Sequence, residues 1–358
     1  MCSPKWILAT CLSAFLLTSC GGGNKGNAGD QTPKSKGRTE RWFVVVADRH
    51  APVPKPTNKH ERVVFLHAGS VWIMDPNGAE RTAISVRSHE SADESPAISP
   101  GGDAVAFAST KNGKKTIQVV GLVDMLPKQI TDGSGGGDSE PSWSPDGKRI
   151  VFTRGHPEDR RDLYVVSAEG GTPTLLLKGN DDKPMLAGSL SWSPTGDKVV
   201  FSADRREGRG TALWLIDVGT KRLRRLTVPR PGAWFCRDRF PTWSPNGKRI
   251  AFASNRHVAS GDQAGDYDIY AINPDGSGLT RLTDDPGIAS DPTYSPDGKR
   301  IMFTSTRDRK NAYESELYVM AAEGGKQRRM TRDERPQNGA PSAGLAKQEA
   351  KQDGKDAK

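Results

Sequence analysis

Residues 140–153 read EPSWSPDGKRIVFT, and four other segments of the chain repeat this pattern. They are SPAISPGGDAVAFAS (95–109), SLSWSPTGDKVVFS (189–202), FPTWSPNGKRIAFAS (240–254) and DPTYSPDGKRIMFTS (291–305). Their Ser-Pro steps begin at residues 99, 144, 193, 244 and 295, so the intervals are 45, 49, 51 and 51 residues. A period of this length indicates a repeat architecture in which each unit is one small sheet.

The Ser-Pro-Asp-Gly-Lys step explains why each unit contains a strand reversal. Proline suits the first central position of a turn because its φ is fixed, and glycine supplies the positive φ that follows. A strand ending at Trp143 therefore reverses into one beginning at Lys148. The second strand, such as Arg149–Thr153, is apolar at consecutive positions, which is expected when both faces of its sheet are covered.

A second half follows each pattern and supplies two more strands. It is seen in LYVVSAEGGTPTLL (163–176) and IYAINPDGSGLTRLT (269–283), and six such halves occur, the first at residues 71–85. Four short strands at this period are typical of a propeller blade. The sequence therefore predicts an all-β fold: a six-bladed β-propeller of four-stranded antiparallel blades.

Blade one lacks a recognisable first strand, because its repeat begins at residues 62–66 (RVVFL), which match a second strand. The spacing after Thr331 predicts an inner strand about ten residues later, where residues 338–344 read NGAPSAG. We therefore expect this C-terminal segment to complete blade one. The run WFVVV (42–46) is also strand-like, but the repeat gives it no place.

The repeated Pro-Ser/Thr-Trp/Tyr-Ser-Pro-Asp/Asn-Gly-Lys-Arg step resembles that of the TolB-type, WD-like propeller family of bacterial envelope proteins. The resemblance covers roughly residues 60 to 343. It implies a propeller fold and a location in the cell envelope.

The first nineteen residues resemble the signal peptide of a bacterial lipoprotein. Lys5 precedes a mostly apolar stretch, and Leu17-Thr18-Ser19-Cys20 resembles a lipobox, in which the cysteine is acylated after cleavage. Cys20 is thus the predicted lipidation site and membrane anchor. If the host has two membranes, we expect the protein to be anchored in the outer membrane and to face the periplasm; otherwise, we expect it at the cell surface. The alternative is an ordinary signal peptide that happens to contain a cysteine.

The predicted domain boundaries follow from composition. Residues 1–19 form the signal peptide, 20–40 the lipidated cysteine and a flexible tether without large apolar residues, 41–343 the propeller, and 344–358 a disordered charged tail. Of the four cysteines only Cys236 falls within the propeller, so an intrachain disulfide is not expected there.

The net charge of +9 is spread among residues of both signs, which does not favour nucleic-acid binding. The loops that follow the second strands and the connectors between blades are long and irregular, and such loops on a rigid ring commonly bind partners. We expect the protein to be a monomer whose partner is an envelope protein or a cell-wall polymer. Its loops are rich in arginine and contain a tryptophan, and both residue types are enriched at binding interfaces. The candidate contact residues are Arg154, Arg205, Trp234, Phe235, Arg237, Arg239, Arg256 and Arg307.

Two other sets of residues have different interpretations. Glu140 and Asp291 begin inner strands and are candidates for lining the channel mouth. The aromatic residues that recur at one repeat position are expected to pack between blades: Trp143, Trp192, Trp243 and Tyr294. The alternative for each candidate arginine is that it extends into solvent beside acidic loop residues.

An enzyme is not expected, and neither a cofactor nor a metal is assigned. The chain has no Gly-x-Ser-x-Gly elbow, phosphate-binding Gly-x-x-x-x-Gly-Lys loop or HExxH motif. The alternative is a metal-dependent polysaccharide lyase of the oligogalacturonate type, or a sugar-binding protein, that uses the channel mouth. Its metal would be held by histidines, and the candidates are His67, His89, His156 and His257.

Overall fold

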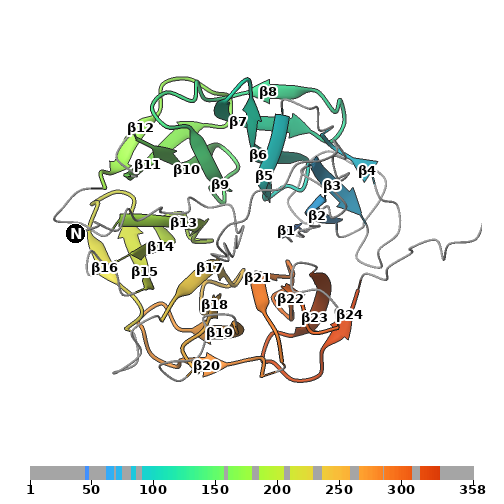
Figure 1. Ribbon diagram of the computed structural model, residues 1–358. Helices are drawn as coiled ribbons and strands as arrows, with labels where there is room; N and C mark the ends of the chain where they lie inside the picture. The colour runs from blue at the N-terminus through green and yellow to red at the C-terminus, as the bar shows by residue number, and fades with distance from the viewer. Residues whose placement is uncertain are drawn as a thin grey trace, which may run out of the picture.

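The structure is a computed structural model, and it describes residues 45–47, 62–67, 70–74, 82–85, 91–156, 160–179, 185–204, 210–228, 236–258, 266–284, 286–308 and 315–330. The described residues form six four-stranded antiparallel sheets arranged as blades around a central axis (Figure 1). This confirms the predicted six-bladed propeller. The described part of the chain contains no helix long and apolar enough to cross a membrane.

The first three blades follow one another along the chain. Blade one comprises β1 (Val45–Ala47), β2 (Arg62–His67), β3 (Ser70–Met74) and β4 (Thr82–Ala83). Blade two comprises β5 (Ser91–Ile98), β6 (Ala104–Lys111), β7 (Lys114–Gly121) and β8 (Pro127–Gln129). Blade three comprises β9 (Asp138–Trp143), β10 (Arg149–Gly155), β11 (Arg161–Ser167) and β12 (Thr174–Leu177).

The remaining blades repeat the same order from the axis outward. Blade four comprises β13 (Met185–Trp192), β14 (Lys198–Asp204), β15 (Thr211–Asp217) and β16 (Leu223–Arg225). Blade five comprises β17 (Asp238–Trp243), β18 (Ile250–Ser254), β19 (Asp268–Ile272) and β20 (Thr280–Arg281). Blade six comprises β21 (Ala289–Tyr294), β22 (Arg300–Ser305), β23 (Glu316–Ala321) and β24 (Arg328–Arg329).

Blade one is completed differently from the sequence-based expectation. β1 pairs with β2 in antiparallel register, with Val45 opposite Val64 and Val46 opposite Val63. Because β3 occupies the other edge of β2, no edge is left for a C-terminal strand to pair with β2. Residues 45–47, which overlap the previously unplaced run at 42–46, thus form the inner strand, and residues 338–344, expected at this position, lie outside the described residues.

The hydrophobic core lies between blades. The phenylalanine of every second strand is buried: Phe65, Phe107, Phe152, Phe201, Phe252 and Phe303. Each of six clusters joins two neighbouring blades, and the one that closes the ring packs Val63 and Phe65 of blade one against Met302 and Leu317 of blade six. Apolar residues at consecutive strand positions are buried because a blade meets a neighbour on each side.

The inner-strand aromatic residues have the predicted packing role. Trp143, Trp192, Trp243 and Tyr294 are all buried. Trp143 also crosses to the neighbouring blade, where its Nε1 donates a hydrogen bond of 3.0 Å to the carbonyl of Ala97. The turns after these residues are closed by their own side chains, since Ser144 Oγ donates to Asp146 Oδ1 and Ser295 Oγ donates to Asp297 Oδ1.

Candidate functional site

Two faces of the propeller differ in their connections. The turn face carries the short turns between first and second strands and between third and fourth strands. The long-loop face carries the loops between second and third strands and the connectors between blades. The inner strands β1, β5, β9, β13, β17 and β21 surround the central axis between these faces (Figure 1).

Five inner strands contain a non-glycine residue in the left-handed region at one equivalent position. The residues, which we call the bulge ring, are Ser95, Glu140, Ser189, Phe240 and Asp291, with φ of 51°, 56°, 53°, 53° and 51°. In every case the pairing of the inner strand with the second strand shifts register there. A left-handed residue other than glycine costs about 1–2 kcal/mol, so the fold maintains five strained positions around its axis.

Proline explains where the bulge forms. Four of the five residues precede a proline, in the pairs Ser95-Pro96, Glu140-Pro141, Phe240-Pro241 and Asp291-Pro292. Proline has no N–H to donate to a ladder, so it is tolerated in a strand at an irregularity of this kind. Bulges redirect side chains and are over-represented near functional sites. All five bulge-ring residues are half-buried, and their chemistry differs from blade to blade.

Charged groups gather beside the ring where blades two, three and four meet. Lys115 Nζ lies 2.5 Å from Glu94 Oε1. Burial raises the pKa of the Glu140 carboxyl, and the nearby Glu94 carboxylate raises it further, whereas Arg161 and a backbone hydrogen bond from Ser189 oppose the rise. The structure thus places Glu140 in a charged cluster on the inner strand.

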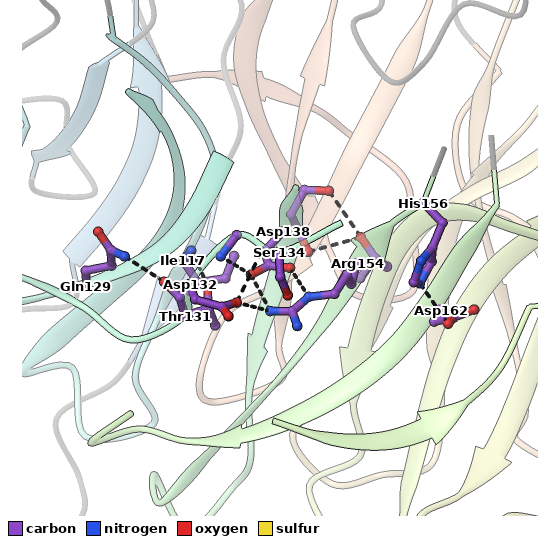
Figure 2. Close-up of polar contacts among 12 residues, drawn as sticks. Ile117, Gln129, Thr131, Asp132, Ser134, Asp138, Arg154, His156 and Asp162 are labelled. Carbon is purple, nitrogen blue, oxygen red and sulfur yellow. Dashed lines mark hydrogen bonds and ion pairs between the residues drawn. The ribbon is translucent and has the colours of Figure 1, made fainter. Parts of the chain in front are cut away.

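Two candidate arginines of the long-loop face are buried, which corrects their proposed role as exposed contact residues. Arg154 Nε and Nη2 donate to Asp138 Oδ1 and Oδ2 at 2.6 and 2.9 Å, and Nη2 also donates to Asp132 (Figure 2). Hydrogen bonding to Asp138 raises the pKa of Arg154. The guanidinium stacks over Phe152 and Tyr164 at 5.5 and 5.2 Å from the ring centroids.

Arg256 repeats this arrangement in blade five. Its Nη2 donates to Asp238 Oδ2 at 2.7 Å, and its guanidinium lies over Phe252 and Tyr270. Arg154 and Arg256 are only 7% and 9% exposed, so they stabilise their own blades and present little surface to a partner.

The other candidate contact residues have several outcomes. Arg307 is half-buried over Phe303 and Tyr318 and lines a cavity of about 630 Å³ that Arg281 and Lys326 share. Arg237 and Arg239 are half-buried, and Arg239 directly precedes Phe240 of the bulge ring. Arg205, Trp234 and Phe235 lie outside the described residues.

The candidate histidines are held within their own blades. His156 Nε2 lies 2.8 Å from Asp162 Oδ2 (Figure 2), and His257 Nε2 lies 3.2 Å from Asp268 Oδ2. Burial lowers the pKa of His257, although Asp268 opposes this effect. His89 and the side chain of His67 lie outside the described residues. Among the residues that the structure describes, no three or more His, Cys, Asp or Glu side chains are grouped to hold a metal ion.

The sequence singled out Glu140 and Asp291 as candidates for the channel mouth, which stays a prediction, but it did not single out Ser95, Ser189 and Phe240 of the bulge ring. A proline inside four of the five repeated inner strands is the sequence feature that could have identified the bulge. The sequence also did not single out Glu94, Lys115 and Arg161, whose proximity depends on how neighbouring blades pack.

Comparisons with known proteins agree with this architecture. The family model described as the TolB beta propeller domain matches residues 64–184 and 241–346. The uncharacterized protein Atu1656 of Agrobacterium fabrum is 31% identical over 176 residues, which are 47% of this chain and only half of that relative.

Two solved structures share the fold. TolB from Acinetobacter baumannii superposes with a TM-score of 0.56 at 23% identity, covering 80% of this chain and 62% of that chain. An oligogalacturonate lyase in complex with manganese superposes with a TM-score of 0.51 at 16% identity, covering 80% of this chain and 84% of that chain. Identities this low show the fold alone. The family match spans well over half of the propeller repeats, and the chain therefore belongs to the TolB β-propeller domain family.

Proposed function

We propose that this protein is a non-catalytic scaffold of the bacterial cell envelope that binds a protein partner at the long-loop face. The observation that carries the proposal is the bulge ring, in which five residues have the same backbone conformation but present three kinds of side chain: two serines, two carboxylates and one phenylalanine. A rigid frame with variable side chains at equivalent positions suits recognition, because the frame fixes where each contact is made.

The composition of the ring favours a protein partner. Phe240 packs in part against the core between blades five and six, and its remaining surface offers an aromatic contact, while Arg239 next to it and Asp291 on the following blade offer opposite charges. Partly exposed aromatic and arginine side chains are enriched among the residues that dominate protein interfaces. Because Arg154 and Arg256 are buried, we leave them out of the proposed contact surface. That surface comprises the bulge ring together with Arg237, Arg239 and Arg307.

An envelope location rests on family membership and on the predicted signal peptide and lipidation site at Cys20, which lie outside the described residues. The non-catalytic assignment rests on the pairing of His156 and His257 with acids of their own blades. Each imidazole thus lies beside an acidic side chain, and the two histidines belong to different blades.

Affinity capture from envelope extracts tests the proposal. The full chain should recover a partner that is lost with Arg239→Ala plus Phe240→Ala and retained with the control Lys248→Ala plus Lys299→Ala on the turn face. Equal recovery by both variants would reject the long-loop face as the site. Stoichiometric manganese or calcium in the purified protein, with unsaturated sugar product from acidic oligosaccharides, would instead support the lyase alternative.

A further inference from the structure

The turn face carries a regular series of lysines. Blades three to six have similar turns between their first and second strands, and each turn carries one lysine near its end. The lysine directly follows the turn glycine in blades three, five and six, whereas in blade four Asp197 comes between Gly196 and Lys198. We call Lys148, Lys198, Lys248 and Lys299 the lysine arc. Lys148, Lys248 and Lys299 are exposed, and Lys198 is half-exposed.

Contacts between turns hold the arc in place. A Cβ added at Gly196 would lie 3.3 Å from Pro145 of the preceding blade, and one added at Gly247 would lie 3.3 Å from Pro194. The same contact recurs between Gly298 and Pro245 at 3.6 Å. Each turn therefore packs against the next, and the four lysines follow a rigid arc around the propeller axis.

The acidic residues of these turns are engaged within the turns themselves. Asp146 Oδ1 accepts hydrogen bonds from Ser144 Oγ and from the backbone N–H of Lys148, and these bonds lower the pKa of Asp146. In blade five the neutral Asn246 takes this place and accepts the same two bonds from Ser244 and Lys248.

The lysine ammonium groups differ in their pairing. Lys198 pairs with Asp197. No ion pair joins Lys148, Lys248 or Lys299 to any residue in the described ranges of the chain. These three ammonium groups are therefore available to an external anion.

Positive charge predominates on this part of the surface. The four turns, at residues 144–149, 193–198, 244–249 and 295–300, contain seven lysines and arginines but only three aspartates. One of the arginines is used in packing, since the Arg149 guanidinium lies 5.0 Å from the centroid of the Trp192 ring on the next blade. The first-to-second turns of blades three to six thus carry an excess of positive charge, although the third-to-fourth turns on the same face carry the exposed Glu169, Asp275 and Glu323.

We propose that the lysine arc binds the anionic headgroups of a lipid bilayer and orients the propeller with its turn face toward the membrane. Lys148, Lys248 and Lys299 occupy the same position of turns that pack against their neighbours, so several ammonium groups on one face can contact the phosphate groups of one bilayer surface. Basic residues near an anionic bilayer contribute to binding additively, and the attraction weakens as salt screens it. The long-loop face then points away from the bilayer.

This orientation does not depend on the proposed partner, because it involves the opposite face. It is also compatible with the predicted tether at residues 20–40, which would reach roughly 25 Å if it behaves as a flexible chain. The tether alone allows any orientation, so the lysine arc would add a preferred one.

Vesicle co-sedimentation tests the inference with the full chain carrying Cys20→Ser, which cannot be acylated. Binding to vesicles of phosphatidylglycerol and phosphatidylcholine is compared with binding to phosphatidylcholine alone, so contributions common to both cancel. We expect preferential binding to the anionic vesicles that decreases at high salt. Lys248→Gln plus Lys299→Gln should lower that preference about 30-fold.

The matched control removes the same charge from the long-loop face. Lys111 and Lys114 are exposed at the β6–β7 hairpin, and Lys111→Gln plus Lys114→Gln should change vesicle binding far less than the turn-face variant does. Both variants should unfold at the temperature of the parent, because the substituted side chains are exposed. Equal loss in the two variants, or equal binding to anionic and neutral vesicles, would overturn the proposal while leaving partner capture by the long-loop face untouched.

Discussion

Arg154 binds both carboxylate oxygens of Asp138, with Nε and Nη2 at 2.6 and 2.9 Å from Oδ1 and Oδ2. Asp138 begins the inner strand of blade three and Arg154 lies near the end of the second strand, so the pair joins the two strands at the long-loop face. Asp138 is fully buried. Arg256 and Asp238 form the equivalent contact in blade five.

Removing one member of the Arg154–Asp138 pair should be strongly destabilising. Arg154→Met leaves a buried carboxylate without its cation, and the expected loss in the free energy of unfolding is about 3 kcal/mol. Adding Asp138→Asn to the Arg154→Met chain removes the unpaired carboxylate charge. The free energy of unfolding of the double variant should therefore fall by less than the sum of the losses in the two single variants. Urea unfolding measures this coupling, and the exposed pair Lys128–Glu169 is the control in which little coupling is expected. Strict additivity at Arg154 and Asp138 would contradict the structural role of the pair.

The left-handed position of Ser189 should accept glycine. Glycine adopts this conformation without the cost that serine has, so Ser189→Gly should leave stability unchanged or increase it by up to about 1 kcal/mol. Ser191, two residues later in β13, provides the comparison, since glycine in regular strand backbone weakens it by about 0.5–1 kcal/mol. Thermal unfolding of the two variants gives the comparison, and equal destabilisation would show that Ser189 is not strained.

The raised pKa of Glu140 predicts a pH dependence. A carboxyl whose pKa is higher in the folded protein binds its proton more tightly there than in the unfolded chain. Its contribution to stability therefore increases as the pH falls through the folded pKa and becomes constant below the ordinary value of 4.5. Above the folded pKa, the folded protein carries a buried charge that costs stability.

Glu140→Gln should remove this pH dependence. The variant is expected to be more stable than the parent near pH 7, with the difference decreasing toward pH 4.5. Urea unfolding at several pH values measures the difference between the two proteins, so titrations common to both cancel. A difference that does not change with pH would mean that Glu140 has an ordinary pKa.

The closure of blade one predicts which end of the chain stabilises the ring. Deleting residues 41–47 removes β1 and leaves the buried Val63 and Val64 without their paired strand, at an expected cost of about 3 kcal/mol. A chain ending at Thr331 retains all four strands of blade one and should melt close to the parent. If the C-terminal truncation melted earlier and the N-terminal deletion did not, blade one would be closed by the C-terminal segment.

The repeat itself was predictable from local chemistry. The Pro and Gly of residues 144–148 determine a turn, and the apolar run that follows determines a strand covered on both faces. β10 begins at Arg149, one residue after the predicted start at Lys148. The inner strand of blade one was not predictable in this way, because residues 45–47 lack the Ser-Pro turn and only pairing with β2 identifies them.

The candidate site was predictable only in part. Charge in an irregular loop does not reveal whether an arginine is exposed, and Arg154 and Arg256 are buried because Asp138 and Asp238 lie opposite them in the folded blade. The four prolines of the inner strands indicated an irregularity there. The left-handed φ of the preceding residue follows from the register shift between strands, which the sequence does not reveal.

Two residues of blade five provide the most direct test of the proposed binding face. Phe240 belongs to the bulge ring in the middle of β17, and Asn246 lies in the turn that follows this strand on the turn face. A photo-crosslinking amino acid placed at either position in the full chain in cells reports its neighbours, and an aromatic one at position 240 replaces a side chain that packs in part against the core, so each variant is first checked for the parent's unfolding temperature. We expect position 240 to crosslink to a partner protein and position 246 not to. Protein crosslinks from position 246 but none from position 240 would contradict recognition at the long-loop face.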